Sequence, residues 1–295
     1  MCISVHQLCY VHADKEPLFQ DINLTVNKGQ RLALVGNNGT GKSTLLRIIE
    51  GSLQPSSGEI ICSSRPYYIP QHFGQFDRLT VAEALRVDNR IKALHAILEG
   101  DTSVENFISL NDDWNVEERC LSALAFWDLG HLQLSRPMHS LSGGEKTKVF
   151  LSGILVHAPE IILMDEPTNH LDVASREKLY EMVKNGRSTM LIVSHDRMLL
   201  NLLPCICELE RNAITLYGGN FDFYKEQKEL ALTALQNRLG EKKKELRQAC
   251  KLAREVMERK NKMNARSEKY AFKKGISRMA VNTLKDKAEK STVRL

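Results

Sequence analysis

The stretch Gly36-Asn37-Asn38-Gly39-Thr40-Gly41-Lys42-Ser43-Thr44 decides the fold class of this chain. It follows the pattern G-x-x-x-x-G-K-[ST], which is typical of a phosphate-binding loop. Its glycines allow a tight turn in which successive backbone N–H groups point at one anion. Lys42 supplies a positive charge for the outer phosphates of a nucleotide, and Ser43 supplies a hydroxyl for Mg²⁺.

The segments on either side of this loop fit that interpretation. Residues 31–35 have the sequence Arg-Leu-Ala-Leu-Val, which predicts a buried strand, and residues 43–49 have the pattern of a helix. A helix that begins directly after the loop turns its positive N-terminal end toward a bound phosphate. The sequence therefore predicts an α/β fold built around a nucleotide-phosphate site.

Two further apolar runs end in residues that carry chemistry. Residues 161–164 lead into Asp165 and Glu166, and residues 189–193 lead to His195. We expect Asp165 to hold the Mg²⁺ shell and Glu166 to polarise the attacking water as a general base. Because the carboxyl ends of parallel strands meet at one edge of a sheet, His195 should lie near the phosphate loop, where a neutral imidazole can contact the γ-phosphate.

Charge is distributed unevenly along the chain. The net charge is +5, but residues 226–295 hold 20 Lys+Arg and 9 Asp+Glu, a net of +11, whereas residues 1–225 have a net of −6. A basic segment attached to an acidic globule indicates a polyanionic partner for that segment alone. A solvated helix face is the alternative, but the excess here has one sign.

Cysteine usage and hydropathy indicate the compartment. The seven cysteines are odd in number and scattered, which favours reduced thiols over disulfides or a zinc site. The N-terminus lacks the pattern of a signal peptide. No stretch approaches the roughly 20 apolar residues needed to cross a bilayer. We therefore expect a cytoplasmic protein with no membrane partner.

The pattern of elements predicts two parts. Residues 1–225 form the globular part, in which residues 1–30 alternate as antiparallel strands do and residues 80–157 contain a helical subdomain. Residues 226–295 are rich in charged helix formers. We expect one helix to about Lys262, a tip at residues 263–275, and a second helix from near Ile276, which together make an extended helical hairpin.

Taken in order, the motifs resemble those of the ATP-binding cassette (ABC) superfamily. The resemblance covers residues 1–225 and includes the phosphate loop, a Q-loop at Gln71, the signature Leu-Ser-Gly-Gly-Glu at 141–145, the Walker B strand at 161–166, the D-loop ending at Asp172, and the switch at His195. The resemblance implies an ABC-type P-loop cassette that binds and hydrolyses ATP with Mg²⁺.

The resemblance also assigns roles to individual residues. It makes Gln71 a catalytic residue beside Glu166 and His195, and a Mg²⁺ ligand beside Ser43 and Asp165.

In this superfamily the nucleotide lies between two cassettes, so the signature meets ATP bound to the other cassette. Ser142 and the N–H groups of Gly143 and Gly144, followed by Glu145, would form that second anion cradle at a helix N-terminus.

The aromatic ring that stacks on adenine in this superfamily has no clear counterpart. By spacing, the position falls on His12, and Tyr10 lies two residues earlier on the same strand face. Either ring is a candidate for the adenine contact.

A narrower resemblance is to the ABC-F family. It rests on Asp-Glu-Pro-Thr-Asn-His-Leu-Asp at 165–172, on Gly-Gly-Asn-Phe-Asp-Phe-Tyr at 218–224, and on the charged hairpin that follows. Members have two cassettes in one chain, and known members act on ribosomes as translation factors or as antibiotic-resistance proteins. The resemblance implies that residues 226–295 contact ribosomal RNA or tRNA, and that the chain is a fragment ending before a second cassette, or dimerises.

Two other functions fit parts of the pattern. An ABC ATPase associated with DNA would also use a basic hairpin, which would then prefer duplex DNA. The ATPase subunit of a membrane transporter would share the motifs up to His195, but it would not need the hairpin.

Overall fold

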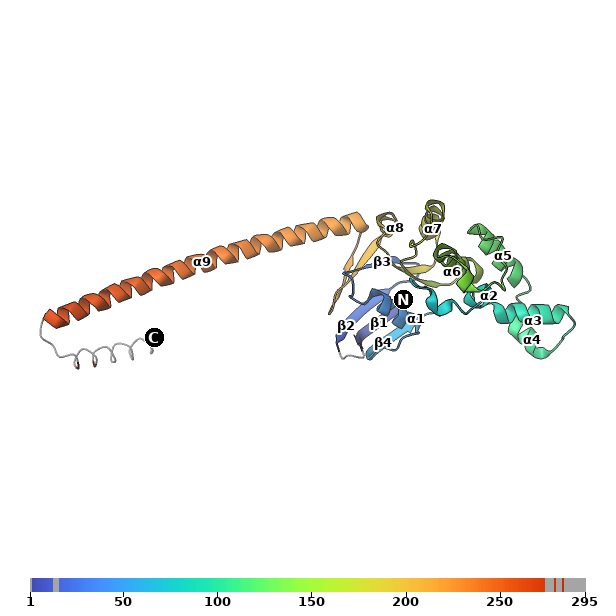
Figure 1. Ribbon diagram of the computed structural model, residues 1–295, viewed down its shortest axis with the longest axis horizontal. Helices are drawn as coiled ribbons and strands as arrows, with labels where there is room; N and C mark the ends of the chain where they lie inside the picture. Colours follow the sequence, from blue (N-terminus) through green and yellow to red (C-terminus); the bar gives the residue numbers. More distant parts are fainter. Residues whose placement is uncertain (1, 13–15, 274–278, 280–282, 284–295) are drawn as a thin grey trace. The chain divides into compact units, whose positions relative to one another are not determined.

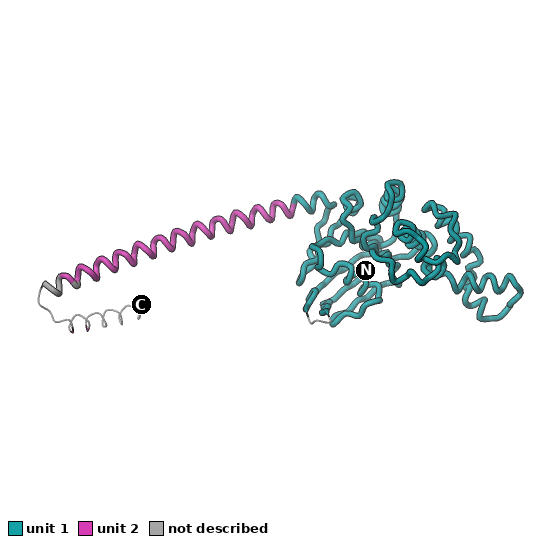
Figure 2. Tube along the Cα trace, in the orientation of Figure 1, with its two compact units in different colours: residues 1–226 teal, residues 227–295 magenta. Residues whose placement is uncertain are grey.

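The computed structural model describes residues 2–12, 16–273, 279 and 283. The chain divides into two compact units, Met1–Glu226 and Gln227–Leu295 (Figure 2). The strands of the described residues all belong to the first unit, and most of the long helix α9 belongs to the second.

A six-stranded sheet lies at the centre of the first unit, in the order β5-β6-β7-β3-β8-β9 (Figure 1). Its neighbouring strands are parallel except for the antiparallel pair β8 and β9. The strands are β3 (Arg31–Val35), β5 (Tyr67–Ile69), β6 (Ile161–Asp165), β7 (Thr189–Val193), β8 (Cys205–Leu209) and β9 (Ile214–Tyr217). Because β6, β7 and β3 are adjacent and parallel, the loops that follow them leave the same edge of the sheet.

A second sheet is antiparallel, as the alternating pattern of residues 1–30 predicts. Its order is β2-β1-β4, with β1 at Ile3–Val11, β2 at Pro17–Val26 and β4 at Ser57–Cys62. From the sequence we expect a turn at residues 55–58 and a strand at 59–62. The strand β4 instead begins at Ser57, because Ser57 pairs with Cys9 of β1.

The helices fall into those that support the sheet and those of the helical subdomain. In chain order they are α1 (Lys42–Glu50), α2 (Val81–Ala84), α3 (Asp88–Leu98), α4 (Val104–Leu110), α5 (Val116–Phe126), α6 (Gly143–His157), α7 (Val173–Asn185) and α8 (Arg197–Asn201), with short 3₁₀ turns at Gly74–Phe76 and Met138–Ser140. From the sequence we expect a helix from about Lys146 to His157. The helix α6 instead begins at Gly143, because Ser142 and Glu145 form a capping box at its N-terminus.

Both faces of the central sheet are buried. Ile162 and Met164 of β6 belong to the apolar cluster that includes α6 and the helical subdomain. Ile161 and Leu163 of the same strand belong to the cluster that includes α1 and the antiparallel sheet. Successive side chains of a strand point to opposite faces, so burial on both faces requires the continuous apolar runs from which these strands were predicted.

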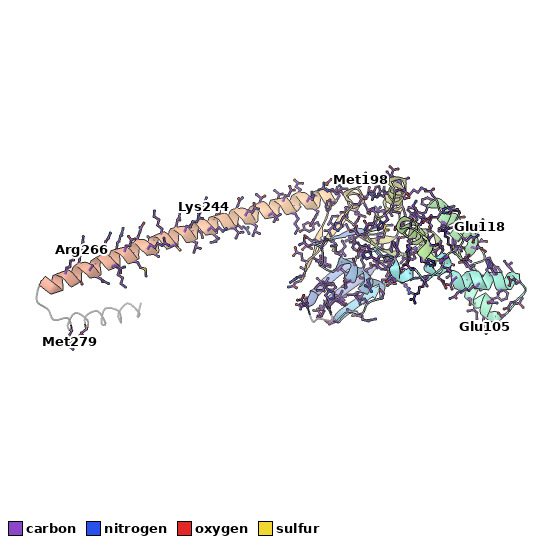
Figure 3. All side chains as sticks on the ribbon, viewed as in Figure 1. Glu105, Glu118, Met198, Lys244, Arg266 and Met279 are labelled. Atoms are coloured by element: carbon purple, nitrogen blue, oxygen red, sulfur yellow. The ribbon has the colours of Figure 1, made fainter. Side chains whose placement is uncertain are left out.

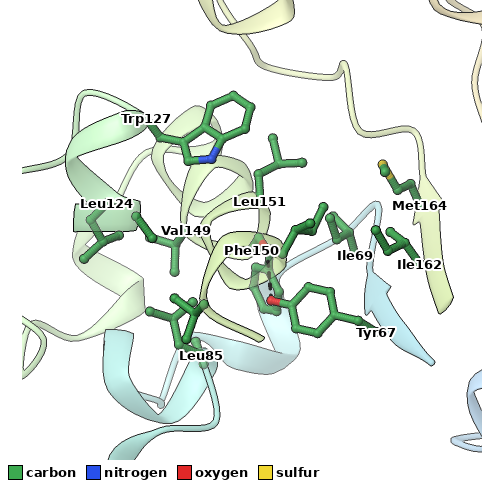
Figure 4. Close-up of a cluster of buried hydrophobic side chains, with 14 of the residues drawn as sticks. Tyr67, Ile69, Leu85, Leu124, Trp127, Val149, Phe150, Leu151, Ile162 and Met164 are labelled. Carbon is green, nitrogen blue, oxygen red and sulfur yellow. Dashed lines mark hydrogen bonds between the residues drawn. The ribbon is translucent and has the colours of Figure 1, made fainter. Parts of the chain in front are cut away.

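The first cluster also fixes the helix that carries the signature. Figure 4 shows Tyr67 of β5 and Phe150 of α6 side by side in this cluster, where the Tyr67 hydroxyl donates a hydrogen bond of 2.9 Å to the Phe150 carbonyl. Trp127 is fully buried in the same cluster. Contacts in the core thus help to hold α6 in place. The predicted α/β fold with antiparallel and helical subdomains is confirmed.

The helix α9 spans Phe221–Lys273 and begins before the predicted start near Glu226. Asn220 precedes it, and its Oδ1 accepts a hydrogen bond of 3.1 Å from the Phe223 N–H, as an N-cap residue does. The predicted tip is wrong for residues 263–273, which are helical, because no glycine or proline separates them from the preceding turns. Residues 274–278 and most of the predicted second helix lie outside the described residues.

None of the helices that the structure describes is both long enough and apolar enough to cross a membrane.

Candidate functional site

The predicted phosphate loop, acidic pair and switch histidine line one cavity of about 460 Å³. The cavity lies at the edge where β3, β6 and β7 end. Its lining residues are His12, Leu18, Asn38, Gly39, Gly41, Lys42, Ser43, Thr44, Gln71, Asp165, Glu166, Val193 and His195. The expectation that parallel strands bring these motifs together is confirmed by the geometry.

The phosphate loop is held in a closed turn by its own side chains. The Lys42 ammonium donates to the carbonyls of Gly36 and Asn37, at 2.9 and 3.0 Å, and the Thr40 hydroxyl donates to the Asn37 carbonyl at 2.9 Å. Burial lowers the pKa of Lys42, while the carboxylates of the acidic pair oppose that effect. The loop therefore keeps a lysine in a partly desolvated place, where its charge attracts an anion strongly.

Gly41 is the point at which the loop becomes a helix. Its φ is +93°, and a Cβ there would lie 2.6 Å from the side chain of Leu18. No side chain caps α1, and its first turn holds no acidic residue. The first N–H groups of α1 therefore face the cavity without a protein acceptor from a cap, as binding of a phosphate requires.

The acidic pair lies at the end of β6 and is almost fully buried. Asp165 is 2% exposed and Glu166 is 7% exposed. Burial raises the pKa of Asp165, although hydrogen bonds from Ser43 and Tyr68 oppose the shift. Burial also raises the pKa of Glu166, against the hydrogen bond from the His195 N–H. A carboxylate with a raised pKa is a stronger base than an exposed one, as a catalytic base requires.

Glu166 and the switch histidine are in direct contact. The Glu166 carboxylate accepts a hydrogen bond of 3.1 Å from the His195 N–H, and its other oxygen lies 3.5 Å from the His195 imidazole. The imidazole itself is 70% exposed and lines the cavity. The φ of Glu166 is +52°, a conformation that non-glycine residues rarely adopt and that turns the chain sharply after β6. Glu166 and His195 are thus joined by a hydrogen bond at the wall of the cavity.

The donor set around Asp165 suits Mg²⁺. Ser43, Gln71 and Asp165 all line the cavity and all offer oxygen, which is the ligand atom that Mg²⁺ prefers. One buried oxygen of Asp165 has no hydrogen-bond partner in the described structure. Within the part of the chain that the structure describes, no group of three His, Cys, Asp or Glu could hold a metal alone. Mg²⁺ held partly by nucleotide phosphates fits both observations.

Replacing Asp165 with Asn should stabilise the chain, without nucleotide, by about 1 kcal/mol at about pH 8. Because the pKa of Asp165 is raised in the folded state, its ionised form opposes folding once the pH exceeds the unfolded pKa. Asn removes that cost, so the gain should vanish as the pH falls below about 3, where both states are protonated. Thermal melts across this pH range measure the effect.

Asp172→Asn is the matched control, and we expect it to change the stability of the fold in the opposite direction. A hydrogen bond from Lys148 and one from the Ser175 N–H hold the pKa of Asp172 well below its usual range. Its charge therefore stabilises the fold above the unfolded pKa, and that contribution is lost as the pH falls through the folded pKa. Asn should lower stability at about pH 8 here. If both variants shift stability in the same direction, the assignment of a buried charge cost to Asp165 is wrong.

Of the two rings that are candidates for the adenine contact, the cavity is lined by that of His12. His12 lines the cavity, whereas Tyr10 does not and instead packs against Phe19 with ring centroids 6.2 Å apart. The ring of Tyr10 also meets that of His12 edge to face, at 5.5 Å. Tyr10 thus supports His12 from the core side. Leu18, which the sequence analysis did not single out, adds an apolar surface to the same wall.

The signature and the D-loop lie outside this cavity among the residues that the structure describes. Ser142 caps α6: its hydroxyl donates to the Glu145 carboxylate at 2.8 Å and accepts from the Glu145 N–H at 3.3 Å. The Ser142 hydroxyl is therefore engaged in its own helix. Asp172 caps α7 and forms an ion pair of 2.9 Å with Lys148 of α6, which ties the D-loop to the signature helix.

The two glycines of the signature have a packing role that sequence reasoning missed. A Cβ at Gly144 would lie 2.6 Å from the backbone oxygen of His170, and one at Gly143 would lie 3.3 Å from the His170 ring. The D-loop therefore passes directly over the start of α6. A second missed residue is Tyr68 of β5, whose hydroxyl donates to Asp165 at 3.4 Å.

Comparison with known proteins agrees with this geometry. The ABC transporter family model matches residues 19–169. The chain is 31% identical to the uncharacterized ABC transporter ATP-binding protein YkpA of Bacillus subtilis, over 83% of this chain and 49% of YkpA. It is 30% identical to ABC transporter F family member 2 of Arabidopsis thaliana, over 76% of this chain and 30% of the relative.

A third relative is the tylosin resistance ATP-binding protein TlrC of Streptomyces fradiae, which is 28% identical over 94% of this chain and 55% of TlrC. The chain thus spans about a third to a half of the length of the curated relatives that it matches.

Solved structures share the fold. An ATP-binding subunit of an ABC transporter matches with a TM-score of 0.59 at 23% identity, over 78% of this chain and 94% of that one. A dimeric bacterial ABC transporter cassette matches with a TM-score of 0.56 at 22% identity, over 73% of this chain and 98% of that one.

Proposed function

Because this chain belongs to the ABC ATPase family, whose cassettes use ATP with Mg²⁺, we propose that it is the first cassette and linker of an ABC-F protein that acts on the ribosome. The protein would serve as a translation factor or would protect the ribosome from an antibiotic. The observation that carries the proposal is a long, basic, exposed helix that continues directly from an ABC cassette.

The helix α9 has the properties of a nucleic-acid contact. The side chains that the structure describes along α9 are exposed from Glu229 onward, and Lys244 and Arg266 project from the helix (Figure 3). Residues 226–295 hold a net charge of +11. Phosphate contacts by lysine and arginine release counterions, so such a helix would bind ribosomal RNA with an affinity that falls steeply with salt.

The relatives support the narrower assignment. One is named as an F family member and another as a tylosin resistance protein. The match with TlrC extends over 94% of this chain and so includes part of α9. A transporter subunit would have no use for this helix.

The chemistry of the cassette follows from the cavity. Lys42 and the N-terminus of α1 would bind the ATP phosphates, and Glu166 would take a proton from the attacking water. Mg²⁺, held by Ser43, Gln71 and Asp165, would neutralise charge on the β- and γ-phosphates.

The signature, which lies apart from this cavity, would meet ATP on a second cassette. That cassette belongs to the same full-length chain or to a second copy. The dimeric bacterial cassette with the same fold provides a precedent for this arrangement.

Ribosome co-sedimentation of the full-length gene product tests the proposal. The protein carries Glu166→Gln and the matching change in any second cassette, and it is assayed with ATP and with ADP. We expect ATP-dependent pelleting. Replacing Lys242, Lys243 and Lys244 with Gln should weaken pelleting and should reduce the slope of log affinity against log salt by about 2–3.

The matched control neutralises acids on the same helix, Glu241→Gln with Glu255→Gln, and should bind at least as well as the parent. Absence of pelleting with either nucleotide would refute the ribosome as partner. Binding to duplex DNA in preference to ribosomal RNA would instead identify a DNA-associated ABC ATPase.

A further inference from the structure

The first turn of α9 lies against the loops that form the nucleotide site. We define residues 221–226 as the α9 root, and all of them belong to the first unit. A helix begins with N–H groups that have no partner within the helix, so other parts of the protein must supply acceptors. The acceptors at the α9 root connect it to two other elements of the cassette.

One connection is a two-point hydrogen bond to α8. The Asn201 side chain accepts a hydrogen bond of 3.1 Å from the Asp222 N–H, and its Nδ2 donates at 3.0 Å to the Asp222 carboxylate. Asn201 is the last residue of α8, so this helix supplies one of the N-terminal acceptors of α9. A shift of α8 would therefore break or strain the cap of α9.

The other end of α8 is joined to the switch histidine. Asp196, the residue after His195, caps α8 by accepting hydrogen bonds from the N–H groups of Met198 and Leu199, at 2.9 and 3.4 Å. The Asp196 carboxylate also accepts from the Tyr180 hydroxyl of α7. One short helix, α8, thus separates the switch histidine from Asn201, which accepts from the first turn of α9.

The second connection leads to the phosphate loop. Glu208 of β8 is buried, and its carboxylate accepts from the hydroxyls of Tyr224 and Tyr217, at 3.0 and 3.2 Å. In the sheet Glu208 lies opposite Val35, the residue directly before the phosphate loop. The two tyrosine rings meet edge to face at 5.0 Å. The α9 root is therefore hydrogen-bonded to β8, the strand that pairs with β3.

A small hollow of about 250 Å³ lies between these elements. It is lined by Gly36 and Asn37 of the phosphate loop, by His195, and by Glu208, Phe221 and Tyr224, among others. This space borders both the phosphate loop and the α9 root. The α9 root, the switch histidine and the phosphate loop thus all border this hollow.

We propose that Asn201 and Glu208 are positioning residues that couple the α9 root to the nucleotide site, so that the terminal phosphate of ATP stabilises the first turn of the linker helix. Contact of His195 with the γ-phosphate fixes the switch loop and hence α8. Asn201 then holds the Asp222 N–H more firmly. ADP lacks this phosphate and leaves the cap looser. The inference rests on ATP binding in the cassette and does not depend on the ribosome.

Hydrogen–deuterium exchange of the full chain carrying Glu166→Gln tests this coupling. With ATP and Mg²⁺, exchange in residues 221–226 should slow about fivefold relative to ADP, the factor that corresponds to one capping hydrogen bond. Peptides from residues 36–50 report binding, and both nucleotides should protect them. In Asn201→Asp the new carboxylate repels that of Asp222, and the ATP-specific protection of residues 221–226 should disappear while residues 36–50 stay protected.

Asn185→Asp is the matched control, because Asn185 of α7 likewise donates from the end of its helix to a carboxylate, that of Glu181, at 3.0 Å. It should keep the ATP-specific protection of the α9 root. Protection of residues 36–50 with no ATP-specific change at residues 221–226 would overturn the coupling alone. Persistence of that change in Asn201→Asp would also overturn it. Lack of protection at residues 36–50 would refute ATP binding and the coupling together.

Discussion

Replacing Glu166 with Gln is expected to lower ATP turnover by about 10²- to 10⁴-fold while ATP binding remains. The carboxylate is buried beside the nucleotide cavity, and its raised pKa makes it a better base than an exposed glutamate. Gln keeps the volume of the side chain and one oxygen that can accept the His195 N–H, but it cannot take a proton from water. The phosphate loop and Lys42 are untouched, so nucleotide affinity should hold.

Two quantities are measured in full-length protein with the change in both cassettes: the steady-state rate of phosphate release and the affinity for ATP. Glu160→Gln is the control at the opposite end of the same strand, where the carboxylate is half-exposed and pairs with Lys28 at 3.1 Å. It should hydrolyse ATP at the parent rate. Undiminished turnover in the Glu166 variant would show that another group activates the water, and loss of binding would show that the residue holds the fold of the site.

The fold and most of the nucleotide cavity could be predicted from sequence because their signals are local. Continuous apolar runs such as 161–164 and 190–193 indicate strands buried on both faces, and the phosphate loop specifies its own strand–turn–helix context. The carboxyl ends of parallel, adjacent strands meet at one edge of the sheet. Asp165, Glu166 and His195 follow such ends and therefore lie together.

The contacts that were missed depend on pairings between distant segments. Tyr68 reaches Asp165 only because β5 pairs with β6, and no periodicity in the sequence specifies that neighbour. His170 meets the signature glycines only because the D-loop passes over α6. By contrast, a local signal was present for the start of α6, since Ser142 and Glu145 have the Ser-x-x-Glu spacing of a capping box, and applying it would have corrected the expected start near Lys146.

Gly144→Ala is expected to lower ATP turnover by about 10²-fold without removing ATP binding, because misplacing catalytic groups by about 1 Å has that effect. The added Cβ would lie 2.6 Å from the His170 carbonyl oxygen, which is backbone and cannot rotate away. Either α6 or the loop over it must shift. That loop carries Glu166 at one end and Asp172 at the other, so the displacement reaches both the catalytic base and the D-loop.

Two further glycine substitutions separate this packing role from a direct role in contacting ATP on the second cassette. Gly143→Ala would meet only the His170 ring, at 3.3 Å, and a side chain can move, so its loss of turnover should be clearly smaller. Gly240→Ala lies on α9 with nothing within 4 Å and should leave turnover unchanged while stabilising its helix by about 1 kcal/mol. Equal losses at Gly143 and Gly144 would mean that the signature glycines serve the nucleotide itself and that the contact with His170 is incidental.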